Sequence, residues 1–319
     1  MTLPSSTATP ARVLLAMPEF RSLLGARALA ALGMSAIATV VAFQTWEVTG
    51  DPLSLGLLGL VEAIPALGLM LFGGHVADRR DRRSIILITG SMLALGALVL
   101  AFISTTGEGA SFAGILAVVF AIGVAAGFER PALVAFETQV IPIEHATRGA
   151  SLSGGAWTAA AIIGPAFGGI SIAFVGIPTT YLLIAVALGL SVILVSRISR
   201  KPMPEVEESE SVAHSLAGGV KYVAHHQVLL SSMALDLFAV FFGGAMAMLP
   251  IYATDILGVG PIGLGALRTM PSAGALVAML AAGRWQPRKN AGRILLVCVA
   301  LFGVAMIVFG LSTEFVLSL

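Results

Sequence analysis

Residues 53–83 read LSLGLLGLVEAIPALGLMLFGGHVADRRDRR. The part from 53 to 75 holds a single charged residue, Glu62, and a helix needs about 20 apolar residues to cross roughly 30 Å of hydrocarbon. The part from 76 to 83 includes four arginines and two aspartates. This stretch therefore predicts a membrane-spanning helix that ends in a strongly charged loop.

The rest of the chain follows the same pattern. Of its 319 residues, 57% are hydrophobic and 11% are charged, whereas about 25% of the residues of a soluble domain are charged. A backbone in hydrocarbon must satisfy its own hydrogen bonds, which favours helices. We therefore expect an all-α polytopic membrane protein, embedded in a lipid bilayer, with about nine spans and the start of a tenth. The expected spans are 23–46, 53–75, 84–105, 112–128, 149–175, 179–196, 229–254, 263–283 and 294–312, and the tenth begins at Phe315.

The lysines and arginines are distributed unevenly around these spans. Sixteen of the 18 fall in the five stretches expected on one side of the membrane, including the loop at 76–83 and a loop after residue 128 that contains Arg130. The loops expected on the opposite side carry only acids. Because basic residues are enriched in cytoplasmic loops, we expect a cytoplasmic N-terminus.

The sequence disfavours several classes of function. The net charge is +1 and the basic residues lie in short loops, which argues against nucleic-acid binding. The single cysteine, Cys298, allows neither an intramolecular disulfide nor a thiolate metal site. None of the three lysines completes the phosphate-binding pattern G-x-x-x-x-G-K-[ST]. We expect no enzyme activity, no metal, no cofactor and no use of ATP, so that a proton or another coupling ion supplies any energy.

The sequence contains an internal repeat at an offset of 206 residues. The positions that recur without gaps are Leu58, Gly59, Pro65, Gly68 and Arg82, which match Leu264, Gly265, Pro271, Gly274 and Arg288. Two parallel six-helix halves explain this repeat better than coincidence does. We expect an N-terminal half (1–197), a cytoplasmic linker with an interfacial helix (198–228) and a second half (229–319). A second half equal to the first would extend to about residue 403, so we interpret the chain as C-terminally incomplete.

Four ionisable residues fall within the expected spans. Glu62 lies near mid-membrane, and Arg268 lies at the matching depth of the other half. They could form an ion pair between the halves, belong to two separate sites, or serve as structural residues. Asp236 could contact substrate, the linker or Arg27, while Arg27 itself is expected to extend toward the membrane surface. We take all four as candidates for substrate binding or proton coupling.

The charged loop has an ordered set of glycine, aspartate and arginines. It reads Gly74-His75-Val76-Ala77-Asp78-Arg79-Arg80-Asp81-Arg82-Arg83, which resembles G-x-L-A-D-R-x-G-R-R/K, the signature loop of the major facilitator superfamily. The resemblance implies a gating role for Gly74, Asp78, Arg79, Arg82 and Arg83. We expect Gly74 to let its helix approach a neighbour, Asp78 to cap a nearby helix N-terminus, and the arginines to pair with acids.

A second motif lies in the expected span 149–175. Gly164-Pro165-Ala166-Phe167-Gly168-Gly169 resembles the G-x-x-x-G-P-x-x-G-G motif of exporters in this superfamily, with Ala160 in place of the first glycine. Proline removes a backbone donor, and small residues allow close helix contact. We therefore expect a kink at Gly164, Pro165, Gly168 and Gly169, with generic helix packing as the alternative. Residues 128–132 and 236–238 resemble the enterobactin-exporter-like and multidrug-exporter branch.

The resemblance implies a function as well as a fold. It implies a secondary transporter of the bacterial inner membrane that exports small amphipathic molecules of the siderophore or drug class. Alternating access would come from rocking of the two halves around a central site. The alternative is a truncated membrane fragment without transport activity, or an interaction protein.

Overall fold

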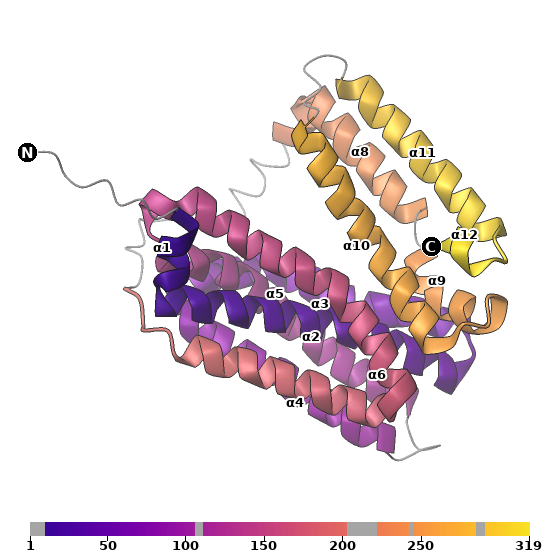
Figure 1. Cartoon of the computed structure of the whole chain (residues 1–319), viewed down its shortest axis with the longest axis horizontal. Helices are drawn as coiled ribbons and strands as arrows, with labels where there is room; N and C mark the ends of the chain where they lie inside the picture. Colours follow the sequence, from indigo (N-terminus) through magenta and orange to yellow (C-terminus); the bar gives the residue numbers. More distant parts are fainter. Residues whose placement is uncertain (1–9, 106–110, 203–221, 243–244, 285–290) are drawn as a thin grey trace, which may run out of the picture.

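A computed structural model describes residues 10–105, 111–202, 222–242, 245–284 and 291–319. Every regular element in these ranges is a helix (Figure 1). The α-helices are α1 (Pro10–Ala16), α2 (Pro18–Thr49), α3 (Pro52–Arg79), α4 (Arg82–Thr105), α5 (Phe112–Val140), α6 (Ala146–Ser196), α8 (Gln227–Phe242), α9 (Ala245–Ile251), α10 (Gly260–Arg284), α11 (Ala291–Leu311) and α12 (Phe315–Ser318). Two short turns complete them, η2 (Ile143–His145) and the π-helical η3 (Tyr252–Ile256).

The helices coincide with the apolar runs of the sequence. Some expected spans are nevertheless joined in one helix, and another is split among several. Within the described residues, seven helices are long and apolar enough to cross a membrane. The expected spans 149–175 and 179–196 are both contained in α6, which has one non-helical residue, Gly176, with φ 78°. The expected span 229–254 is divided among α8, α9 and η3, while residues 243 and 244 lie outside the described ranges. The all-α prediction is confirmed, and the number of spans stays a prediction.

Local sequence explains the tight turn between α2 and α3. Gly50 ends α2 in the left-handed conformation, at φ 57°, which glycine adopts without a steric penalty. The carboxylate of Asp51 then accepts a hydrogen bond from the Leu53 N–H at 3.0 Å. Pro52 follows at the first position of α3, where its missing N–H costs nothing. Two residues therefore suffice to reverse the chain.

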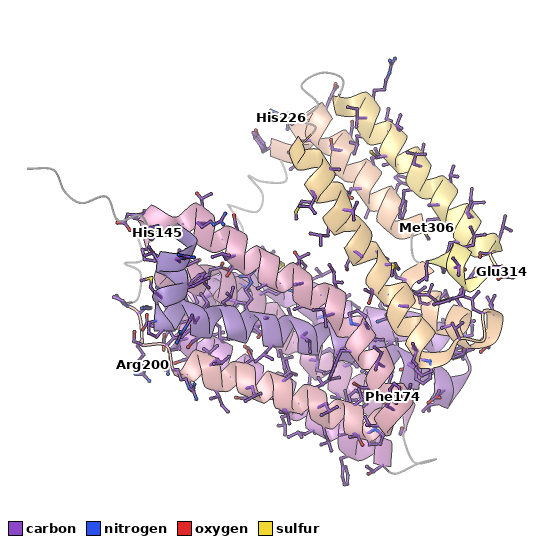
Figure 2. The ribbon with its side chains drawn as sticks, in the orientation of Figure 1. His145, Phe174, Arg200, His226, Met306 and Glu314 are labelled. Atoms are coloured by element: carbon purple, nitrogen blue, oxygen red, sulfur yellow. The ribbon has the colours of Figure 1, made fainter. Side chains whose placement is uncertain are left out.

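The helices form two groups that we name by their elements. The first helix group contains α1–α6, and the second contains α8–α12 (Figure 1). We call the end of the first group where α3 meets α4 the arginine end, and the end where α2 meets α3 the acidic end. The groups converge at the acidic end and diverge toward the arginine end. In Figure 2, Arg200 at the arginine end of the first group lies far from His226 of the second group.

The buried core has the same asymmetry. One cluster at the acidic end joins Leu249, Ala253, Leu264 and Leu267 of the second group to residues of the first, such as Val40. Two further clusters toward the arginine end contain only residues of the first group. Many large apolar side chains remain on the outside of the helices, as expected of helices that lipid covers. Among the described residues, the hydrophobic contact between the groups is therefore concentrated at the acidic end.

A hydrogen bond reinforces this contact. The indole Nε1 of Trp46, near the end of α2, donates to Oδ1 of Asp255 in η3 at 3.3 Å. These two residues are separated by 209 positions in the chain. The bond links the two helix groups at the acidic end.

Candidate functional site

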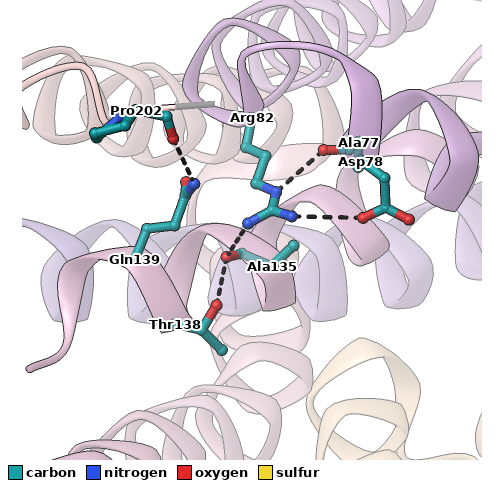
Figure 3. Close-up of polar contacts among 7 residues, drawn as sticks. All are labelled: Ala77, Asp78, Arg82, Ala135, Thr138, Gln139 and Pro202. Atoms are coloured by element: carbon teal, nitrogen blue, oxygen red, sulfur yellow. Dashed lines mark hydrogen bonds and ion pairs between the residues drawn. The ribbon is translucent and has the colours of Figure 1, made fainter. Parts of the chain in front are cut away.

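Arg82 organises the arginine end of the first helix group. Its Nε donates to the carbonyl oxygen of Ala77 at 3.0 Å, and its Nη1 donates to that of Ala135 in α5 at 3.1 Å. Its Nη2 lies 3.4 Å from Oδ1 of Asp78. Figure 3 shows this guanidinium between α3 and α5. Arg82, at the start of α4, thereby ties three helices together.

The neighbouring charges hold the first residues after α6. Arg83 donates from Nη2 to the carbonyl oxygen of Ser196, near the end of α6, at 2.6 Å. Lys201 pairs with Glu19 at 2.6 Å. The side-chain amide of Gln139 donates to the carbonyl oxygen of Pro202 at 3.1 Å (Figure 3). The end of α6 is therefore fixed to α4, and the beginning of the expected linker to α2 and α5. Its remainder, residues 203–221, lies outside the described ranges.

Two expectations for the signature loop need correction. A β-carbon on Gly74 would meet nothing within 4 Å in the described chain, so the close helix approach is not made there. It is made by Gly73, whose β-carbon would overlap the carbonyl oxygen of Gly127 in α5. Asp78 interacts with Arg82 and leaves 69% of its side chain exposed, and it caps no helix among the described residues. Arg79 is exposed as well.

We expect Arg82→Gln to destabilise the protein by about 1.5–3 kcal/mol, the range for hydrogen bonds to charged groups. The backbone carbonyls of Ala77 and Ala135 would lose their charged donor. Thermal unfolding in detergent measures the effect. Arg80→Gln is the matched control, because Arg80 is exposed at the neighbouring turn. Equal melting temperatures for the two variants would contradict a structural role for Arg82.

A cavity of about 340 Å³ lies between α2, α3, α5 and α6. Four charged residues line it together with apolar ones; the charged residues are Arg27, Glu62, Glu129 and Arg130. Its apolar lining includes Met34, Leu67, Leu133 and Trp157. A cavity that combines a few charged groups with apolar and aromatic surface is the usual form of a small-molecule site.

Arg27 does not extend to the membrane surface, which corrects our expectation. Its guanidinium forms an ion pair with the carboxylate of Glu137 in α5, and the two side chains are 17% and 12% exposed. Nor is it paired with Asp236, which lies on α8 with an exposed side chain. Sequence reasoning missed Glu137 because it ended the span at residue 128. Inside the helix bundle, Glu137 compensates the charge of Arg27, so the side chain does not need to reach the membrane surface.

The same extension of α5 corrects the placement of Arg130. We expected it in a loop, because the predicted span ended at residue 128. The helix instead continues through Pro131 to Val140, and proline is tolerated in membrane helices where neighbours satisfy the freed carbonyl. Glu129 and Arg130 consequently line the cavity.

Glu62 and Arg268 lie on opposite helix groups, in α3 and α10, and interact electrostatically. Glu62 also interacts with Arg130 of α5. In the described part of the chain, ion pairs within 4.0 Å join Arg27 to Glu137, Arg82 to Asp78, Arg200 to Asp81 and Lys201 to Glu19. Glu62 and Arg268 therefore interact across the two helix groups without forming a direct ion pair in the described chain.

The glycine-proline motif of α6 contacts two different helices. A β-carbon on Gly164 would lie 2.9 Å from the carbonyl oxygen of Leu32, and one on Gly168 3.3 Å from that of Ala36, both in α2. Gly169 faces α10, where its β-carbon would overlap the carbonyl oxygen of Pro261. The motif thus packs α6 inside the first group on one side and against the second group on the other.

The expected kink lies elsewhere in the helix. Pro165 is inside α6 at a helical backbone conformation, and the non-helical residue is Gly176. Proline only removes one donor and keeps a helical φ, whereas a φ of 78° is open to glycine without a steric cost. The motif therefore packs closely against other helices without a break of its own, and the break in α6 lies further along the helix, at Gly176.

Fold and site together define a multi-pass membrane protein whose two helix groups meet at one end and whose first group contains a charged cavity. A family model described as Major Facilitator Superfamily matches residues 23–319, and the chain belongs to this superfamily.

Individual proteins resemble parts of the chain. The multidrug efflux pump Tap of Mycobacterium tuberculosis and of Mycobacterium bovis is 28% identical over 232 residues, which cover 68% of this chain and 54% of the pump. The chain thus spans about half the length of these curated relatives. Among solved structures, a bacterial homologue of the human lysosomal transporter Spinster, in an inward-facing and occupied conformation, superposes with a TM-score of 0.70 at 15% identity, over 98% of this chain and 70% of that one. A POT family transporter superposes with a TM-score of 0.65 at 14% identity, over 93% and 79% of the two chains. The structural matches establish the fold.

Proposed function

We propose that this protein is a secondary transporter that exports small amphipathic molecules by alternating access. The observation that carries the proposal is the asymmetric contact between the two helix groups. They share a buried core only at the acidic end, among the described residues, while Glu62 and Arg268 face each other from the two groups. Rocking about this contact would expose the space between the groups to alternate sides of the membrane.

The proposal includes an orientation. The arginine end faces the cytoplasm, because basic residues are enriched in cytoplasmic loops. The N-terminus is then cytoplasmic, in the inner membrane of a bacterium. With the groups in contact at the acidic end, the conformation corresponds to an inward-facing state.

The substrate class follows from the cavity and from the relatives. The cavity combines charged residues with the indole of Trp157, which suits amphipathic molecules. The similarity to a multidrug efflux pump supports drugs as substrates, and siderophores are the second class we propose. The driving force would be an ion gradient, with Glu62 as the candidate group for carrying a proton.

We also propose how the chain divides into two halves and which roles its motif residues have. Residues 1–197 form the first half, 198–228 the linker and 229–319 the second half. We assign gating to Gly74, Asp78, Arg79, Arg82 and Arg83. We assign close packing within the first half to Gly164 and Gly168, and close contact between the halves to Pro165 and Gly169. Asp236 and Arg27 remain candidates for contact with substrate.

A cross-link at the acidic end tests alternating access. We expect that joining cysteines at positions 46 and 255, in a Cys298→Ala background, stops transport, because the two groups could no longer separate there. Transport of fluorescent amphipathic amines, acids and zwitterions into or out of proteoliposomes is measured after treatment with a short bifunctional thiol reagent. The single variants Trp46→Cys and Asp255→Cys receive the same treatment as controls. Undiminished transport by fully cross-linked protein would refute the mechanism.

A further inference from the structure

Arg268 is held firmly at the boundary between the two helix groups. One turn before it, a β-carbon on Gly265 would lie 2.7 Å from the carbonyl oxygen of Pro165 in α6. One residue after it, the hydroxyl of Thr269 lies 3.1 Å from the carbonyl oxygen of Ile162, also in α6. These contacts fix the backbone of α10 on both sides of Arg268, so the position of its Cα is set by the packing of α10 on α6.

The guanidinium of Arg268 has unused donor capacity. Its Nε is buried and, among the described residues, has no hydrogen-bond partner. An arginine side chain carries five N–H donors in a planar fork that matches a carboxylate or phosphate. A buried donor without an acceptor is unfavourable, so an anionic group placed beside Arg268 would be bound favourably.

Glu62 presents the opposite charge from the first helix group. Its segment of α3 is packed against α5, since a β-carbon on Gly123 would lie 2.5 Å from the carbonyl oxygen of Glu62. Its carboxylate interacts with Arg268 and Arg130 but is in none of the direct ion pairs of the described chain. An ammonium group placed beside Glu62 would therefore gain an acceptor.

The charges of the cavity lining, taken together with Arg268 on α10, sum to zero. Within the lining, Arg27 is neutralised by Glu137, which leaves Glu62, Glu129 and Arg130. Arg268, which is not part of that lining and interacts with Glu62 from the second helix group, makes the set two acids and two bases. A ligand with only one charge would leave one of the facing groups, Glu62 or Arg268, without a partner, and an uncompensated buried charge is costly. A ligand with one charge of each sign would satisfy both.

We propose that the substrate is a zwitterionic amphiphile whose acid group binds Arg268, whose amino group binds Glu62, and whose apolar body lies on Trp157. This inference rests on the proposed function, because it takes the cavity lined by Glu62 and Trp157 as the transport site. It adds the class of substrate. Each half contributes one charge, so binding depends on both helix groups.

A matched series of ligands tests the charge requirement. Nε-dansyl-lysine carries a free α-amino and a free α-carboxyl group, its α-amide keeps only the cation, and its Nα-acetyl derivative keeps only the anion. Fluorescence anisotropy of the dansyl group measures binding to the purified 319-residue chain in lipid nanodiscs near neutral pH. We expect the zwitterion to bind about tenfold more tightly than either derivative, the factor that one charge-assisted hydrogen bond provides.

Variants assign each charge to its partner. Arg268→Gln should reduce zwitterion binding to the level of the amide without changing amide binding. Glu62→Gln should reduce it to the level of the acetylated ligand. Arg293→Gln, on the exposed side of α11, is the matched control and should leave all three affinities unchanged. Thermal unfolding confirms that each variant is folded.

Two sets of outcomes separate this inference from the exporter proposal. Equal affinity for the three ligands, no binding of any of them, or an unchanged zwitterion preference in Arg268→Gln would overturn the inference, even if proteoliposomes transport the ligands. Selective binding of the zwitterion that both substitutions abolish would support it. If that selective binding occurred without transport in proteoliposomes, the exporter proposal would fail while the zwitterion site would stand.

Discussion

Replacing Arg27 by methionine is expected to destabilise the protein by about 3–5 kcal/mol, the range for breaking a buried ion pair by removing one partner. The carboxylate of Glu137 would remain in a site where its side chain is 12% exposed, without the guanidinium that neutralises it. Glu137→Leu should have an effect of similar size, because it leaves Arg27 unpaired instead. Chemical or thermal unfolding in detergent measures both losses.

The double variant shows whether the pair itself is responsible. With Arg27→Met and Glu137→Leu combined, no charge is left unpaired, and most of the lost stability should return. Arg293→Met is the control for the loss of an arginine, since Arg293 is exposed on α11. If the two single effects simply add in the double variant, the two residues act independently and the proposed coupling is wrong.

Gly169→Ala is expected to weaken the contact between the helix groups and to cost about 1–3 kcal/mol, the range for overpacking. The new methyl group would overlap the carbonyl oxygen of Pro261 and lie 3.0 Å from the Cα of Gly265. Backbone atoms cannot rotate away as a flexible side chain can, so α6 and α10 must separate. Gly265→Ala should act in the same direction from the other helix.

The yield of the cross-link between cysteines at 46 and 255 measures this separation directly, and thermal unfolding measures the loss of stability. Gly189→Ala is the matched control, because the same α6 helix has nothing within 4 Å of a β-carbon at that position. An unchanged cross-link yield in Gly169→Ala would show that the glycine contact does not hold the groups together.

The helices themselves could be predicted from the sequence with simple physical rules. The expected span 53–75 lies within α3, and its charged continuation coincides with the α3–α4 turn, because a long apolar run in hydrocarbon has no alternative to an intrahelical hydrogen-bond ladder. The signature loop also indicated the superfamily that the family model confirms. The prediction was wrong at the end of α5, because it ended the span at residue 128 and the helix continues to Val140.

That error has a physical cause: the sequence does not show which distant residue compensates a charge. A charged residue ends a membrane span only if no partner compensates it. Glu137, in the part of α5 that the prediction left out, is compensated by Arg27, which lies 110 residues away in the chain. Apolar patterning cannot locate such partners, since lipid-facing and helix-facing surfaces are both apolar in a membrane protein. The sequence by itself determined the helical segments, the charged loop and the family. Only the tertiary structure decided that Arg27 meets Glu137, that Gly169 meets Gly265, and that Glu62 faces Arg268, because each of these relations depends on how the helices pack against one another.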